Sequence, residues 1–281
     1  MSWNRIKADL TILFFGHILN PLLWKRSRRS RKRVGIVRMA VDRYLDAYVP
    51  VIASIEEDAE NVQDGPERIF SIWLQGEENA PEIVKACFRS IRHNCVQELV
   101  VLDEHTVGEW IELPEYILKK RSEGKIKPAH FADICRVALL YKYGGIWLDA
   151  TAFVVSPIPE WVMNEDFFIY LSGNSLGGHY AFVQNCFFRA RKNNYIVKVW
   201  MNAIFEYWRR ENSVIDYFMH QMIFRKVVEC NPVAKAYFEK MPHVIQDPTH
   251  ELWWKYRDEP FDKKLFDRIT ASAVFQKTEY K

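Results

Sequence analysis

The spacing of hydrophobic residues changes from helical to extended along the chain, and the clearest change lies between residues 128 and 157. Apolar side chains first recur at helical spacing, at Ile134, Val137, Ala138 and Tyr141. Gly144 and Gly145 then end the predicted helix, because glycine adopts positive φ at no steric cost. The apolar run 146–148 predicts a short strand that ends at Asp149. Ligands bind at this end of the strands in open α/β sheets, so Asp149 is a candidate site residue.

Short apolar runs bounded by polar loops predict the remaining strands. They cover residues 68–74, 98–102, 167–171 and 181–189, with further extended chain after Asp149. Amphipathic segments predict helices at 81–92, within 106–123 and across 194–228. The first strand, loop and helix form a Rossmann-type nucleotide-binding opening, although it has no Gly-x-Gly-x-x-Gly run. The order of elements therefore predicts an α/β fold, with a mixed sheet flanked by helices.

The N-terminal residues differ from the rest and predict an amphipathic and basic helical extension. Their apolar stretch of about 17 residues has four interruptions, at Asp9, His17, Asn20 and Pro21. It is shorter and less pure than the ~20 residues that a spanning helix needs. Eight Lys or Arg residues and no acid follow between Lys25 and Arg38. An apolar segment followed by cations is typical of a helix on an anionic membrane surface, so we expect residues 1–38 to bind there. A core-docked helix and a solvated basic tail are the alternatives.

The positive charge of the chain is concentrated in this basic segment. The overall net charge of +3, less the eight charges of the segment, leaves −5 for the remaining residues. No aromatic residues are interleaved with the basic ones, so we expect no nucleic-acid partner. A polar linker that ends at Gly65-Pro66 follows. We therefore divide the chain into an extension, residues 1–64, and a domain, residues 65–281.

The cysteines suggest neither a disulfide framework nor a metal site. There are five of them, Cys87, Cys95, Cys135, Cys186 and Cys230. They form no Cys-x-x-Cys pair, and no histidine stands at metal-ligand spacing from them. An odd count without a pattern fits a reducing compartment, and we interpret Cys135 as a packing residue.

The predicted helix before Asp149 carries two charges on an otherwise apolar body. Asp133 and Arg136 are three residues apart and therefore share a helix face. They are either a surface ion pair, worth about 0.2–0.5 kcal/mol, or part of a polar ligand site together with Asp149. The spacing alone favours the surface pair.

A longer motif changes that balance. The run HFADICRVALLYKYGGIWLDAT, residues 130–151, resembles the signature of the bacterial capsular polysaccharide synthesis glycosyltransferases. That family is related to retaining sugar transferases with an aspartate-any-aspartate motif, including the glucosylating clostridial toxins and the yeast mannosyltransferases that initiate outer chains. The shared features are an Asp-x-x-Arg helix, a glycine pair before an aromatic strand, and an acid at its end, here Asp133, Arg136 and Asp149. The resemblance covers about residues 66–281 and implies a GT-A fold.

The resemblance also implies a nucleotide-diphosphate sugar as donor, with a UDP-sugar favoured. In the relatives the first strand and its loop touch the base and ribose, an asparagine faces the sugar, and a C-terminal segment folds over the diphosphate. The residues that match in this sequence are Trp73, Gln75, Gly76, Asp133, Trp147, Asn185 and Lys277. Lys277 would meet phosphate as an ammonium point charge. A plain core position is the alternative for Trp73.

The acidic motif departs from the family pattern at its third residue. The relatives have two aspartates separated by one residue, whereas this chain has Asp149-Ala150-Thr151. The resemblance implies a divalent cation, Mn²⁺ or Mg²⁺, held by Asp149 and Thr151. A neutral hydroxyl is a poorer ligand for these hard ions than a carboxylate, so the ion would depend on Asp149 and the diphosphate, with water completing its shell.

Residues 215–221 resemble a second family motif, Asp-Tyr-Phe followed by a histidine. Asp216 and His220 are four residues apart, and on a helix they would share a face. They are either a hydrogen-bonded pair that supports the helices or part of the site. In the second case Asp216 would lie beside the donor sugar or the acceptor hydroxyl.

The resemblance as a whole implies a retaining hexosyltransferase acting on a capsular or surface polysaccharide. The implied catalytic residues are Asp149, Arg136, Asp133 and Asp216. The acceptor would be a lipid-linked or polysaccharide glycan, reached from the cytoplasmic face of a bacterial plasma membrane by a peripheral protein. One alternative is a non-catalytic, membrane-associated capsule assembly factor. Another is a sugar-phosphate transferase, which would release a nucleoside monophosphate.

Overall fold

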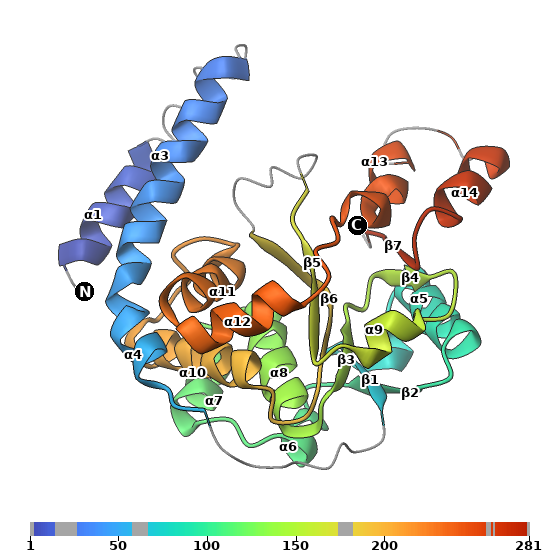
Figure 1. Cartoon of the computed structure of the whole chain (residues 1–281), viewed down its shortest axis with the longest axis horizontal. Helices are drawn as coiled ribbons and strands as arrows, with labels where there is room; N and C mark the ends of the chain where they lie inside the picture. Colours follow the sequence, from blue (N-terminus) through green and yellow to red (C-terminus); the bar gives the residue numbers. More distant parts are fainter. Residues whose placement is uncertain are drawn as a thin grey trace.

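The computed structural model describes residues 3–14, 27–57, 67–173, 182–256, 260 and 262–279, and its centre is a five-stranded mixed sheet (Figure 1). The strands are β1 Arg68–Ile72, β2 Glu98–Leu102, β3 Gly145–Leu148, β5 Phe167–Leu171 and β6 Val183–Ala190. Their spatial order is β2-β1-β3-β6-β5. β1 is parallel to β2 and β3, whereas β6 is antiparallel to both β3 and β5. The predicted mixed α/β sheet is therefore confirmed.

Helices cover both faces of this sheet. One face carries α8 Pro128–Tyr143, α10 Tyr195–Arg210, α11 Met219–Cys230 and α12 Pro232–Lys240, and the other carries α5 Glu82–Asn94 and α9 Glu160–Asn164. The short elements η3 Glu77–Asn79, α6 Val107–Trp110 and α7 Glu115–Ser122 occupy the connections. Side chains alternate along the strands, so that Phe70 and Trp147 pack towards α8 while Ile69 and Ile146 pack towards α5.

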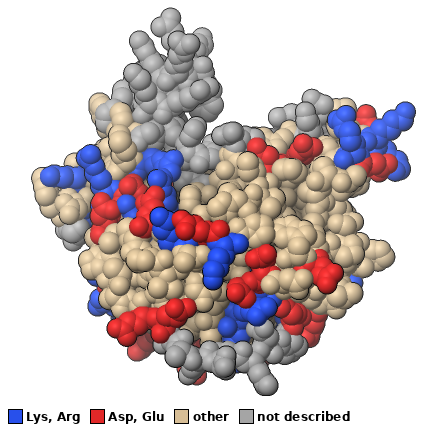
Figure 2. Space-filling model, viewed as in Figure 1, with Lys and Arg blue, Asp and Glu red and all other residues tan. Residues whose placement is uncertain are grey.

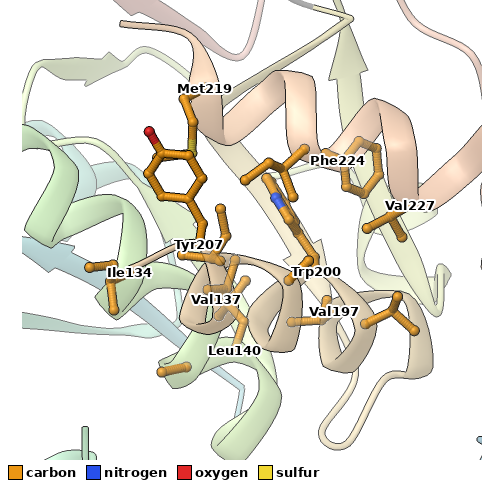
Figure 3. Close-up of a cluster of buried hydrophobic side chains, with 14 of the residues drawn as sticks. Ile134, Val137, Leu140, Val197, Trp200, Tyr207, Met219, Phe224 and Val227 are labelled. Atoms are coloured by element: carbon orange, nitrogen blue, oxygen red, sulfur yellow. The ribbon is translucent and has the colours of Figure 1, made fainter. Parts of the chain in front are cut away.

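The larger core lies where three helices meet on the α8 face (Figure 3). α8 contributes Ile134, Val137 and Leu140, α10 contributes Val197, Trp200 and Tyr207, and α11 contributes Met219, Phe224 and Val227. All nine side chains are at most 1% exposed. This packing fixes the position of α8, which carries Asp133 and Arg136, against the sheet.

The predicted N-terminal extension is helical and is partly docked on the domain. It comprises α1 Trp3–Ile12, α3 Ser27–Leu45, η2 Asp46–Tyr48 and α4 Val49–Ser54. Arg5 is buried and donates hydrogen bonds to the Tyr207 hydroxyl (3.3 Å) and to Ser213 Oγ (3.1 Å). The first turns of α3 stand clear of the body in Figure 1. None of the helices formed by the described residues has the length and apolar character that crossing a bilayer requires.

The C-terminal segment returns to the sheet through a second, two-stranded sheet. After η4 Asp247–His250, α13 Glu251–Tyr256 and α14 Lys263–Thr270, strand β7 Phe275–Lys277 pairs antiparallel with β4 Ala152–Val154. The register places Lys277 opposite Ala152. The C-terminal segment with Lys277 thus returns to the chain that follows Asp149, and it does so as a strand.

The predicted continuous helix over 194–228 is wrong in its middle. α10 ends at Arg210 and α11 begins at Met219, so Asp216 lies outside both helices. The Asp216 carboxylate accepts a hydrogen bond from the backbone N–H of Phe218 (2.8 Å). Such a local side-chain bond offers the backbone an alternative to helix, which is why the chain turns here.

Strand β6 contains a bulge that the sequence does not reveal. Ile169 of β5 pairs with Phe188, but the next residue, Tyr170, pairs with Gln184. Residues 185–187 are therefore additional on β6 relative to β5. Bulges re-aim side chains and recur beside functional sites. Here the bulge turns the Asn185 side chain towards α8 and α11.

Candidate functional site

The candidate site lies at the edge of the sheet where the parallel strands end. Asp149 directly follows β3, and its backbone N–H donates to the carbonyl of Cys186 on β6 (2.9 Å). Trp73 follows β1, the parallel neighbour of β3, and Asn185 lies near the beginning of antiparallel β6. The N-termini of α5 and α8 reach the same edge, because each of these helices runs antiparallel to the strands beside it. Their positive dipole ends favour an anionic ligand there.

A pair of glycines brings α8 and β3 into this arrangement. Gly144 has φ +69° and Gly145 has φ +96°, both in the region that favours glycine. A Cβ on Gly145 would lie 2.5 Å from the carbonyl oxygen of Arg68 on β1. The close approach of β1 to β3 therefore requires glycine at this position.

Three donors hold the Asp149 carboxylate. Lys277 Nζ lies 2.6 Å from Oδ2, Trp147 Nε1 lies 2.8 Å from Oδ1, and Arg136 Nη2 lies 3.4 Å from Oδ1. The side chain of Asp149 is 24% exposed and that of Lys277 is 22% exposed, so both remain within reach of a ligand. The predicted group of Asp133, Arg136 and Asp149 lies together, and Lys277 joins it.

Arg136 connects the two acids. Its guanidinium lies 3.0 Å from Asp133 Oδ1, donates to the backbone carbonyl of Asn185 (2.5 Å), and stacks 4.8 Å from the centre of the Trp147 ring. Its side chain is only 6% exposed. The pair of Asp133 and Arg136 is therefore not a surface ion pair but a buried one, and the alternative that the spacing alone favoured is wrong.

A buried network of polar side chains holds Asp133 in position. Asn185 Nδ2 donates to Asp133 Oδ1 (3.0 Å) and lies 2.9 Å from His220 Nδ1, while its Oδ1 accepts from Gln221 Nε2 (3.0 Å). His130 Nδ1 lies 3.4 Å from Asp133 Oδ2. Both the nitrogen and the oxygen of the Asn185 side-chain amide thus have hydrogen-bond partners within the protein. This network fixes the position of Asp133.

The charges in this cluster balance one another. Burial raises the pKa of Asp149, but Lys277 and Arg136 outweigh it and hold that pKa well below its usual range. Asp133 is also shifted below its usual pKa, since the charge of Arg136 outweighs the effect of burial. Burial lowers the pKa of Lys277, and Asp149 reverses this to a net increase. Both acids are ionised and Lys277 is charged at neutral pH.

His220 behaves differently from these residues. It is fully buried, and burial lowers its pKa to about 3, so it is neutral at physiological pH. Its backbone carbonyl accepts from Trp200 Nε1 (3.0 Å), and its ring lies 4.3 Å from that indole. The predicted pair of Asp216 and His220 does not form, because Asp216 is outside α11 and His220 bonds to Asn185 instead.

The predicted metal ligands fit a divalent cation poorly. Asp149 is the one carboxylate they offer, and both of its oxygens already have cationic or N–H partners. Thr151 is 8% exposed, and its backbone carbonyl accepts two hydrogen bonds from Thr278 (2.8 and 3.0 Å). Across the described ranges of the chain, no group of three or more His, Cys, Asp or Glu side chains could hold a metal ion. Divalent ions at phosphate sites are usually held by one or two carboxylates together with substrate phosphates and water, and the one carboxylate offered here already contacts Lys277, Trp147 and Arg136.

The predicted nucleotide residues line the adjacent strand end. Trp73 is half-buried and its backbone N–H bonds to Leu102 of β2 (2.9 Å), while Gln75 is exposed. Gly76 has φ +86°, which allows the loop to turn into η3. Trp147 is 1% exposed and serves Asp149 through its indole N–H, so it supports the acid from within the core.

Several residues at the site were not predicted. Tyr217 is 66% exposed, and its ring lies 5.8 Å from that of His130. His250 is buried, which lowers its pKa to about 4, with Lys277 adding to the shift. A signal existed for His130, because it precedes Asp133 by the same three residues that separate Asp133 from Arg136. Tyr217 stands inside the Asp-Tyr-Phe motif of residues 215–221, although only Asp216 and His220 were considered there, and His250 has no spacing signal.

Comparisons with known proteins identify the family of this chain. The model of a family described as "capsular polysaccharide synthesis protein" matches residues 24–281. The O-glycosyltransferase braB of Annulohypoxylon truncatum is 25% identical over 131 residues, which are 43% of this chain and 30% of that protein. The O-glycosyltransferase PaGT of Phomopsis amygdali is 27% identical over 120 residues, 40% of this chain and 29% of that protein. The chain thus spans less than a third of the length of these curated relatives.

A solved structure, the PaToxG glycosyltransferase, aligns with 87% of this chain and 99% of its own at a TM-score of 0.46 and 14% identity. The family match covers the helix with Asp133 and Arg136, the strand that ends at Asp149, and the segment with Lys277. The resemblance noted in residues 130–151 is confirmed at the level of the family. The chain therefore belongs to the capsular polysaccharide synthesis protein family.

Proposed function

We propose that this protein is a retaining glycosyltransferase of the GT-A type. It moves a hexosyl unit from a nucleotide-diphosphate sugar, with UDP-sugars favoured, to a capsular or surface polysaccharide. One observation carries the proposal: the Asp149 carboxylate meets two cations, Arg136 and Lys277, at the strand ends where α/β proteins bind nucleotides. The family membership and the O-glycosyltransferase relatives support it.

The chemistry requires stabilisation of charge on the departing diphosphate. Lys277 is partly exposed and offers an ammonium to phosphate oxygens, and the dipoles of α5 and α8 point towards the same place. Arg136 is buried, so its part is to keep Asp149 ionised and oriented. Asp149 then accepts hydrogen bonds from hydroxyls of the donor.

The remaining predicted residues take supporting and acceptor-side roles. Asp133 and Asn185 hold each other and Arg136 in place, which fixes the floor of the donor site. Asp216 is half-buried and faces His130, and burial raises the pKa of its carboxyl. We assign Asp216 and the exposed Tyr217 to the acceptor side. In a same-face transfer the leaving phosphate oxygen takes the acceptor proton, so no separate base is needed.

The variant Asp149→Asn tests this function. We expect it to abolish sugar transfer while the protein keeps its fold, and the exposed Asp267→Asn on α14 serves as a matched control. Products identify the reaction class, since a glycosyltransferase releases a nucleoside diphosphate and a sugar-phosphate transferase a monophosphate. Turnover of Asp149→Asn at the wild-type rate would refute the proposal. Failure of the wild type to bind any nucleotide sugar in calorimetry would favour the non-catalytic assembly factor.

We also propose that the N-terminal helices bind an anionic membrane surface, which would place the enzyme peripherally on the cytoplasmic face of a bacterial plasma membrane near a lipid-linked acceptor. α1 and its continuation expose large apolar side chains, Trp3, Leu10, Leu13 and Phe14, although Arg5 ties α1 to the domain. Residues 28–38 of the basic segment lie in α3, whose first turns lean away from the body (Figure 1). On the face of the domain in Figure 2, acidic and basic side chains are interspersed instead of gathered by sign.

Vesicle co-sedimentation tests this surface. We expect binding to vesicles that contain phosphatidylglycerol, weak binding to phosphatidylcholine alone, and loss of binding as the salt concentration rises. Replacing the five basic residues of 28–33 by glutamine removes about 1 kcal/mol for each cation near the surface. Equal binding to neutral and anionic vesicles would contradict the electrostatic part of the proposal.

A further inference from the structure

The position of Lys277 has a precise structural cause. It is the last residue of β7, and the antiparallel pairing of β7 with β4 sets it opposite Ala152. Thr278, the next residue, is fixed on the Thr151 carbonyl by its N–H and its hydroxyl. The backbone on both sides of Lys277 is therefore bonded to the segment that follows Asp149. This holds the ammonium within 2.6 Å of Asp149 Oδ2.

Lys277 Nζ lies 2.6 Å from Asp149 Oδ2, so this oxygen already has a cationic partner from the protein itself. Thr151 stands where the family pattern has a second aspartate, so one negative charge is missing. The ammonium of Lys277 and the guanidinium of Arg136 supply two positive charges close to Asp149. Because Arg136 also pairs with Asp133 (3.0 Å), the cluster has two acids and two cations, and its charges balance without an added ion.

We propose that Lys277 takes the place of a divalent cation in this protein, so that the diphosphate of the donor binds to side-chain cations and needs no metal. This inference rests on the proposed function and deepens it. When the diphosphate arrives, Lys277 can share its three N–H donors between Asp149 and a phosphate oxygen, because an ammonium carries no fixed geometry. Asp149 thereby positions the lysine and does not act as a metal ligand.

Isothermal titration calorimetry of the full chain tests the proposal. UDP and GDP are titrated separately into wild-type protein dialysed against EDTA, and then into the same protein with Mn²⁺. The variants are Lys277→Met, which keeps the length of the side chain without its charge, and Lys277→Arg, which keeps the charge. Lys263→Met is the matched control, because Lys263 lies on α14 with its side chain 77% exposed.

We expect one of the nucleotides to bind wild type with the same Kd in EDTA and in Mn²⁺. Lys277→Met should weaken it by about 10- to 100-fold, as for the loss of one charged hydrogen bond, while Lys277→Arg and Lys263→Met retain most of the affinity. Binding that EDTA abolishes and Mn²⁺ restores overturns the inference and leaves the proposed function intact. Metal-independent binding that Lys277→Met does not weaken overturns the role of Lys277.

Binding of neither nucleotide under either condition speaks against the proposed function itself. The comparison of EDTA with Mn²⁺ uses wild-type protein alone, so it decides the metal question even if Lys277→Met does not fold. Circular dichroism of each variant separates a loss of charge from a loss of strand β7.

Discussion

Replacing Arg136 by methionine should destabilise the protein more than any exposed arginine replacement, by an amount that depends on pH. Methionine keeps most of the apolar contact with Trp147 but removes the charge that Asp133 and Asp149 share. Removing one partner of a buried ion pair costs about 3–5 kcal/mol, because the other charge remains buried. Asp149 retains Lys277 and Trp147, and Asp133 retains Asn185. We therefore expect the lower value, about 3 kcal/mol.

The pH dependence follows from the direction of the shifts. The pKa values of Asp133 and Asp149 are held below their ordinary range, so their pairing contributes stability above the unfolded-state value near 3.9 and loses it as the pH falls below. Without Arg136, burial raises the pKa of Asp133, and the carboxyl can protonate at mildly acidic pH. The destabilisation should therefore be largest near pH 7 and smaller near pH 5.

Urea and thermal unfolding at pH 7 and pH 5 measure this difference. A loss of about 3 kcal/mol corresponds to a decrease in Tm of roughly 6–12 °C for a domain of this size. Arg225→Met, which removes an i,i+4 pair with Glu229 on α11, is the control and should cost less than about 0.5 kcal/mol. A loss below about 1 kcal/mol for Arg136→Met at pH 7, or an equal loss at both pH values, would refute the reasoning.

Three further predictions concern the rest of the molecule. Gly145→Ala should lower the free energy of unfolding in urea by about 1–3 kcal/mol, because Gly145 has positive φ and the new Cβ would overlap backbone atoms. Gly108→Ala is the control and should cost nothing measurable, since no atom lies within 4 Å of its new Cβ. Similar losses for the two variants would count against this. Arg5→Met should release α1, seen as faster limited proteolysis within residues 3–14, and unchanged cleavage would contradict it. Burial holds the pKa of His250 at about 4, so the unfolded state binds a proton first and the stability of the fold decreases as the pH drops below 6.5. His250→Asn should recover about 2 kcal/mol of this loss at pH 5. An unaltered acid sensitivity of the variant would disprove this.

The parts of the fold that the sequence predicts well are those that depend on local pattern. The strands at 98–102 and 167–171 have the predicted bounds, and the helix with Asp133 and Arg136 ends at the glycine pair as expected. In each case the periodicity of apolar residues and the conformational freedom of glycine act within a few residues. Local pattern also placed Asp149 at the end of a strand, whereas Asp133 and Arg136 became site candidates only through the family resemblance of residues 130–151.

The parts that escaped prediction depend on tertiary contacts. The bulge at 185–187 arises from the pairing of β6 with two different neighbours, and no local pattern marks it. The turn at Asp216 replaced a helix because a side-chain hydrogen bond competed with the helical one. The burial of Arg136 could not be read from an i,i+3 spacing, which is the same for an exposed pair and for a buried one.

The distance along the chain between Asp149 and Lys277 has a consequence for the order in which the molecule is built. The two residues are separated by 128 positions, so β1, β2 and β3 can associate long before β7 is available. Contacts of such long range form late in folding, because closing a long loop costs entropy that is repaid only afterwards. Until then the aspartate lacks its ammonium partner. A chain that has folded only as far as β3 would thus contain most of its sheet but an incomplete site. The site would be complete only once β7 has paired with β4.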